Sequence, residues 1–351
     1  MRWLRAESRI RVAARRILQL VPLIVLLSAA SVMNGGAPVA GAATTLNGDW
    51  APFTRCPVDD PAMLAVDGRM ATSWCVAADS PGGSIKLGNT SAATGETSVQ
   101  FGLIGSAGTF TLVSPPGGAI VAAPVDVPGG LLGLMCPSGD PIVASVCNLI
   151  TDSALNRVTA SVQAAGSPSD FRFDAIITGA PILALPIKIQ LQNPLLGSTC
   201  YIGSDADPVV LHPRVTSFAG VKTRGENFDA NGTPDPRGPL VLGQVSGLTE
   251  GDSSFAVPAA SGCGLAGALD GAINSRAGLP SPSGNNNVAL NNASSSLVSF
   301  ANAGVLYPNA GKQLSDDWHL ACGNCSTTTS DPTLRLTVEF QAHLMPQLTF
   351  R

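Results

Sequence analysis

All eight cysteines of this chain follow an N-terminal export signal, and this arrangement constrains the fold more than any other feature of the sequence. An even number of cysteines in an exported chain indicates disulfides rather than metal ligands or free thiols. We expect neighbouring cysteines to pair, as Cys56–Cys75, Cys136–Cys147, Cys200–Cys263 and Cys322–Cys325. The third pair closes the longest loop, so its predicted contribution to the free energy of unfolding is the largest, on the order of 4 kcal/mol.

The export signal is read from the first residues of the chain. Six arginines precede an apolar run from Ile17 to Ala30, and small residues follow from Ala40 to Ala43, as a signal peptidase requires. We therefore expect residues 1–43 to be a cleaved signal peptide and residues 44–351 to be a secreted β domain. After cleavage the sequence predicts no transmembrane helix, because no other apolar run is long enough. The alternative for the first run is an uncleaved N-terminal anchor.

The clearest secondary-structure signal in the middle of the chain is a strand. Ile187, Ile189 and Leu191 alternate with Lys188 and Gln190, which is the pattern of a strand with one buried and one wet face. Charged residues make up only 13% of the chain, which favours an extracellular β protein over a helix-rich one. We expect a mainly β fold, an antiparallel β-sandwich or two packed sheets with one or two short helices, stapled by disulfides.

Several other segments have strand or helix patterns. Further strands are predicted at residues 84–87, 97–104, 109–113, 157–163, 171–177, 209–211, 215–221, 240–245 and 334–350. The best helix candidate covers residues 264–277, and Asn291–Asn292 are expected in a loop. A division into two subdomains would fall in the small, polar stretch at residues 164–169.

The charge balance excludes some classes of partner. The formal net charge is −4, and basic residues form no cluster outside the signal. A mildly acidic surface of this kind argues against nucleic acid as a partner. A surface rich in hydroxyl and amide groups suits contact with cell-wall polymer or self-association.

One short stretch combines the residue types that acid–base chemistry uses. Asp316, Asp317, Trp318 and His319 place two carboxyl groups, an aromatic ring and an imidazole next to one another. Two carboxyl groups can perform glycoside hydrolysis, so Asp316, Asp317 and His319 are the catalytic candidates. The alternative is that the two acids are solvated residues of a loop.

Two further patterns suggest a metal ion or a redox centre. Asp229, Asn231 and Asp235 place oxygen ligands at alternate positions, as calcium loops do, but the glycine and glutamate positions do not fit. The alternative is a turn capped by its own side chains. Cys322 and Cys325 have the spacing of a redox pair, but a loop follows them where such a pair needs a helix. We therefore expect no metal and no cofactor.

Four stretches carry a resemblance to a known family: Trp50 to Met63, Leu185 to Ser204, Phe255 to Gly264 and Gly278 to Asn287. They resemble a family of uncharacterised secreted proteins of actinomycete bacteria, and the likeness covers most of the mature chain. The resemblance implies a bacterial exported protein. It implies no known activity and no catalytic residue.

These observations favour a non-enzymatic extracellular or cell-envelope-associated structural or binding protein of unknown ligand. One alternative is a secreted hydrolase that uses acidic residues, with Asp316 and Asp317 the first to test. A further alternative is an envelope β-barrel or pore, with which the alternating final strand ending near Phe350 is compatible.

Overall fold

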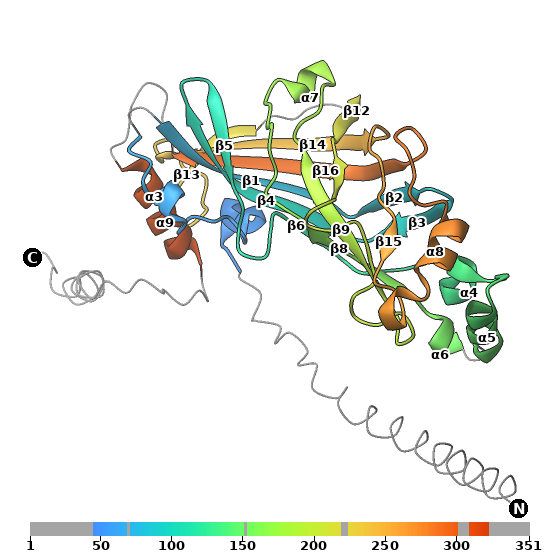
Figure 1. The fold of residues 1–351 in the computed structure, drawn as a ribbon. Coiled ribbons are helices and arrows are strands. Elements are labelled where there is room, and N and C mark those ends of the chain that lie inside the picture. Colours follow the sequence, from blue (N-terminus) through green and yellow to red (C-terminus); the bar gives the residue numbers. More distant parts are fainter. Residues whose placement is uncertain (1–44, 69–70, 151–152, 219–223, 301–308, 323–351) are drawn as a thin grey trace, which may run out of the picture. The chain divides into compact units, whose positions relative to one another are not determined.

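The computed structural model describes residues 45–68, 71–150, 153–218, 224–300 and 309–322. The described chain is mainly β, as the sequence predicts, with two antiparallel sheets and several short helices (Figure 1). The predicted signal peptide at residues 1–43, the predicted strand at 334–350 and Cys325 lie outside the described residues.

The large sheet has ten strands among the described residues, and strands that are neighbours in it are often far apart in the sequence. Its main path is β12 (Arg214–Phe218), β14 (Leu240–Asp252), β16 (Asn287–Phe300), β1 (Ala71–Ser80), β4 (Thr97–Ser106) and β5 (Thr109–Val113). Four more strands pair beside this path: β13 (Arg224–Phe228), β2 (Gly82–Leu87), β3 (Thr90–Thr94) and β6 (Ile120–Ala122).

The small sheet has six strands and is organised around β9 (Leu185–Gln192). The other strands are β7 (Val125–Asp126), β8 (Thr159–Ala164), β10 (Tyr201–Ile202), β11 (Val209–Leu211) and β15 (Ala260–Ser261). Along β9, Ile187, Ile189 and Leu191 are buried and the residues between them are more exposed. The predicted alternation is confirmed, and it fixes which face of the small sheet packs inward.

The two sheets pack against each other through one hydrophobic core. Val76, Phe101 and Leu103 of the large sheet share this core with Ile187 and Ile189 of the small sheet. Residues on both sides of the stretch 164–169 contribute to it. That stretch is hydrogen-bonded to the chain around the start of β9, where Pro186 O accepts from Ala165 N and Ala184 O accepts from Ser169 N.

A second core covers the opposite face of the large sheet. The N-terminal segment supplies Trp50, Phe53 and Met63, from the 3-10 helix η1 (Gly48–Phe53) and the helix α3 (Pro61–Leu64). The helix α9 (Ala310–Ala321) packs beside them, and Trp318 Nε1 donates to Phe53 O at 2.8 Å. The large sheet is therefore the middle of three layers.

Short helices lie mainly near the small sheet. They are α4 (Gly130–Met135), α5 (Pro141–Leu149), α6 (Ser153–Asn156), the 3-10 helix η2 (Leu265–Gly267) and α8 (Asp270–Ala277), whereas α7 (Ala175–Thr178) lies beside β12 of the large sheet (Figure 1). Within the described residues, no helix combines the length and the apolar character needed to cross a membrane.

Three disulfides join neighbouring cysteines: Cys56–Cys75, Cys136–Cys147 and Cys200–Cys263. The first connects the N-terminal segment to β1, the second connects α4 to α5, and the third connects the start of β10 to the residues after β15. These are three of the four predicted pairs. Cys322 is also disulfide-bonded, but its predicted partner lies outside the described residues.

The predicted strand at residues 171–177 is wrong. Arg172 pairs with Asp174, and α7 begins directly afterwards at Ala175. Phe171 and Phe173 instead pack edge-to-face on each other, with ring centroids 4.8 Å apart, and both contact Phe110. The side chains of Phe171 and Phe173 therefore pack against the large sheet, and their backbone does not form a strand.

Two other predicted elements differ from the structure. The helix predicted at residues 264–277 is divided into η2 and α8, and Ala266 inside η2 has a non-helical, positive φ of 53°. Asp270 begins α8, and its carboxylate accepts hydrogen bonds from Cys263 N at 2.7 Å and Gly262 N at 3.2 Å. The predicted loop at Asn291–Asn292 is also wrong, because both residues lie inside β16, where Asn291 pairs with Gly82.

Candidate functional site

Asp316, Asp317 and His319 lie on the helix α9 and not on a loop. Ala310, Leu314, Trp318 and Ala321 are buried at helical spacing and attach α9 to the second core. Gly311 permits this packing, since a Cβ atom at that position would lie 1.9 Å from Met63 O. The acidic residues therefore belong to an amphipathic helix.

Asp316 forms an ion pair within its own helix. Its carboxylate accepts from Lys312 Nζ at 3.0 Å, four residues earlier, and both side chains are about half exposed. Exposed pairs of this kind stabilise a helix by a few tenths of a kcal/mol. This contact is sufficient to account for the position of Asp316.

The carboxyl group of Asp317 has a strongly raised pKa. Burial, together with the smaller effects of the charges of Asp316 and Asp229, raises the pKa of Asp317 to about 6. Asp229 belongs to the predicted calcium loop. The structure thus brings together two stretches that the sequence offered as separate candidates.

The predicted calcium ligands are used in turns. One oxygen of Asp229 accepts from Asn231 N and from Thr233 N, each at 2.9 Å, and Asp235 accepts from Arg237 N. Within the described part of the chain, no group of three or more His, Cys, Asp or Glu side chains has an arrangement that could hold a metal ion. The geometry here is that of side-chain-capped turns.

His319 contacts an acid from another part of the chain. His319 Nε2 lies 2.9 Å from both carboxylate oxygens of Asp59, and Ser315 Oγ donates to Asp59 at 2.7 Å. The His319 hydrogen bond, with the one from Ser315, lowers the pKa of Asp59. In a hydrolytic triad the imidazole lies between the serine and the acid, whereas here the carboxylate lies between them. The three residues fix α9 to the N-terminal segment.

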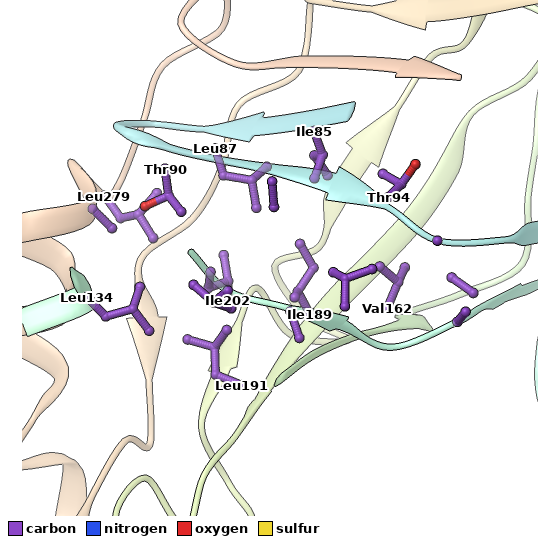
Figure 2. Close-up of a pocket in the computed structure, with 18 of the residues that line it drawn as sticks. Ile85, Leu87, Thr90, Thr94, Leu134, Val162, Ile189, Leu191, Ile202 and Leu279 are labelled. Carbon is purple, nitrogen blue, oxygen red and sulfur yellow. The ribbon is translucent and has the colours of Figure 1, made fainter. Parts of the chain in front are cut away.

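A cavity between the two sheets is the best-formed candidate for a binding site. Its volume is about 90 Å³, and it lies between the β2–β3 hairpin of the large sheet and strands β8, β9 and β10 of the small sheet. Figure 2 shows Ile85 and Leu87 on one side, facing Val162 and Ile189 on the other. Leu134 of α4 also lines it, with Ile273 of α8 and the nearby Leu279.

The wall of this cavity is almost entirely aliphatic. Among the described residues, none with a charged side chain lines it, and its hydroxyl groups come from Thr90, Thr94 and Thr97. Ala92 and Ala160 occupy inward positions where larger side chains would fill the space. The lining of such a cavity favours apolar groups over charged ones.

Sequence reasoning did not identify this cavity. Its lining residues come from many separate elements, and each one alone is an ordinary inward-facing residue of a strand or helix. The available signal was the alternation in β2 and β3, where inward Ile85 and Leu87 are opposite the smaller Ala92 and Thr90. That pattern predicts which face of the hairpin is buried. It does not predict that the opposing sheet leaves a cavity against this face.

We compared the chain with protein-family models, with curated proteins and with solved structures, and none of these comparisons found a match.

Proposed function

We propose that this chain is a non-enzymatic extracellular or cell-envelope binding protein that holds a small apolar molecule between its two sheets. The cavity of about 90 Å³ carries the proposal. An engineered apolar cavity of about 150 Å³ binds benzene, so the volume here suits a short stretch of hydrocarbon. The disulfides are compatible with an extracellular protein.

The chemistry of the wall defines the ligand class. A charged group inside the cavity would lose its hydration without gaining a partner, so the bound part of the ligand must be apolar. A polar end would remain near the threonine hydroxyls or in solvent. A linear fatty acid or fatty alcohol has this combination of properties.

The proposal is tested by calorimetric titration of the mature chain with hexanoic, octanoic and decanoic acid. Ala92→Leu adds three carbon atoms inside the cavity, whereas Ala93→Leu adds them on the exposed side of the same strand. We expect the natural chain and the Ala93→Leu control to bind and Ala92→Leu to bind at least about tenfold more weakly. Ala160→Leu repeats the test from the opposite sheet, and equal binding by all variants would contradict the proposal.

The low-charge surface supports association with cell-wall polymer or with further copies of the chain. Association of this kind is compatible with ligand binding in the cavity, so one protein can do both. Sedimentation with isolated cell envelope and light scattering of the purified chain measure the two forms of association. If the protein neither pellets nor self-associates, this part of the proposal fails.

A secreted hydrolase is the second candidate, and the raised pKa of Asp317 is the observation that favours it. A carboxyl group with a pKa of about 6 is protonated often enough near neutrality to act as a general acid. A panel of glycan and ester substrates tests this candidate. Activity that disappears in Asp317→Asn would support it, and no activity on any substrate would remove it.

A further inference from the structure

Exposed aliphatic side chains gather near the helices at one end of the small sheet. Leu132 of α4, Leu155 of α6 and Leu195 after β9 are 37–38% exposed, and Leu265 of η2 is 93% exposed. We call these four residues the leucine rim. Ile142 of α5, next to α4, is 63% exposed.

Hydrogen bonds connect the segments that carry the leucine rim. Leu132 N donates to the side chain of Asn156, which follows Leu155. Asn193 donates to Leu155 O, and its own oxygen accepts from Leu195 N, each at 2.8 Å. Gly264 N, directly before Leu265, donates to Leu196 O. The backbone segments that carry the four leucines are therefore neighbours in the fold.

Two disulfides and the packing of the helices hold this surface in place. Cys136–Cys147 closes the segment between α4 and α5, and Cys200–Cys263 joins the chain beyond Leu195 to the chain before Leu265. Figure 1 shows α4, α5, α6 and α8 grouped together, and α4 contacts α5, α6 and α8. Exposed leucines on a fixed framework are costly in water, and such patches usually mark an interaction site.

The surroundings of the leucine rim carry very little charge. Residues 193–203 and 255–269 contain no charged residue, and residues 127–150 contain only Asp140. The Asp140 carboxylate accepts from Ile142 N and Val143 N and so caps α5, while Arg157 beside α6 is paired with Asp126. A partner recognised through its charges would find few complementary groups here. Hydrocarbon is the complementary chemistry.

The same elements also line one end of the cavity. Leu134 is two residues from Leu132 on α4. Leu191 is the second-last residue of β9, which leads to Leu195, and Ile273 lies on α8, which follows Leu265. A ligand with an apolar chain partitions from water into a hydrocarbon phase, so a lipid layer is a source from which the cavity can take it.

We propose that the leucine rim inserts into the surface of an uncharged lipid layer, where the cavity exchanges its apolar ligand. The purpose of docking rests on the proposed function, but docking itself is measured separately. Leucine side chains enter the boundary between headgroups and acyl chains, and the polar backbone remains at the headgroup level. The scarcity of basic side chains at the rim means that anionic lipid adds nothing to binding.

Cosedimentation of the mature chain with phosphatidylcholine vesicles tests the proposal. Leu195→Ser combined with Leu265→Ser removes two rim side chains, and we expect binding to fall about tenfold or more. Leu320→Ser on α9 and Ile177→Ser on α7 are the matched controls, because these residues are 62% and 84% exposed but lie outside the rim. Leu265, Leu320 and Ile177 are mostly exposed, so their substitution should leave the melting temperature unchanged. Leu195 is 38% exposed, so thermal unfolding of the double variant checks that it is folded at the temperature of the assay.

The outcomes separate this proposal from the proposed function. Failure of the natural chain to bind, equal loss in the controls, or binding only when phosphatidylglycerol is added would overturn the docking proposal. Vesicle binding that persists in a chain that binds no fatty acid would leave docking intact and refute the cavity function. Retained vesicle binding by Ala92→Leu together with lost fatty-acid binding supports both.

Discussion

Glu250 lies in the interior of the large sheet, and replacing it with Gln should change how stability depends on pH. In the strand register, Glu250 of β14 is opposite Val215 of β12 and Leu290 of β16, and it is 8% exposed. Burial raises the pKa of Glu250 from 4.5 to about 7. The folded protein therefore holds a proton that the unfolded chain has already released near neutral pH.

The size of the effect follows from this difference in pKa. Each unit of pKa corresponds to about 1.4 kcal/mol, so a pKa raised from 4.5 to about 7 corresponds to about 3 kcal/mol of unfolding free energy. This stability is fully present below pH 4.5 and is lost as the pH rises through about 7. Glu250→Gln cannot ionise and should not show this loss.

Urea unfolding of the natural chain and of Glu250→Gln, at about pH 4 and about pH 8, measures the effect. We expect the stability of the variant relative to the natural chain to improve by up to about 3 kcal/mol between the two pH values. Glu96→Gln changes an exposed carboxylate and should give no comparable improvement. An identical difference between Glu250→Gln and the natural chain at both pH values would refute the reasoning.

Two further predictions concern single side chains. Asn286 is 1% exposed, accepts from Gly88 N at 2.9 Å and donates to Phe255 O at 3.0 Å, so Asn286→Ala should cost about 3 kcal/mol while the exposed neighbour Asn285→Ala should cost little. Chemical denaturation measures both, and equal losses would contradict the assignment. The raised pKa of Asp317 means that its ionisation opposes folding above about pH 6. Asp317→Asn should therefore raise the melting temperature above that of the natural chain more at neutral pH than at acidic pH. An increase of the same size at both pH values would contradict an origin in the ionisation of Asp317.

The sequence was most informative where one residue pattern has one physical cause. The alternation along residues 185–192 follows from a strand with one buried face, and β9 has this form. Neighbouring cysteines pair as expected in the three disulfides of which both halves are described.

Prediction was weaker where distant contacts decide the local structure. The polar residues Lys312, Asp316 and Asp317 led to the prediction of a loop, although the apolar residues between them form one face of α9. This face packs on the second core. In the opposite case, Asn291 and Asn292 have low strand propensity, but pairing of β16 with neighbours on both sides keeps them in a strand. The cavity was not predicted, because it depends on how completely two sheets fill the space between them.

Methyl NMR of the mature chain titrated with decanoic acid tests the central claim most directly. The account predicts saturable shifts of the Ile85, Val162 and Ile189 methyl groups, which face one another across the cavity, while the exposed methyl groups of Ile177 stay unchanged. Shifts confined to surface methyl groups, or no shifts at all, would contradict a ligand held between the sheets.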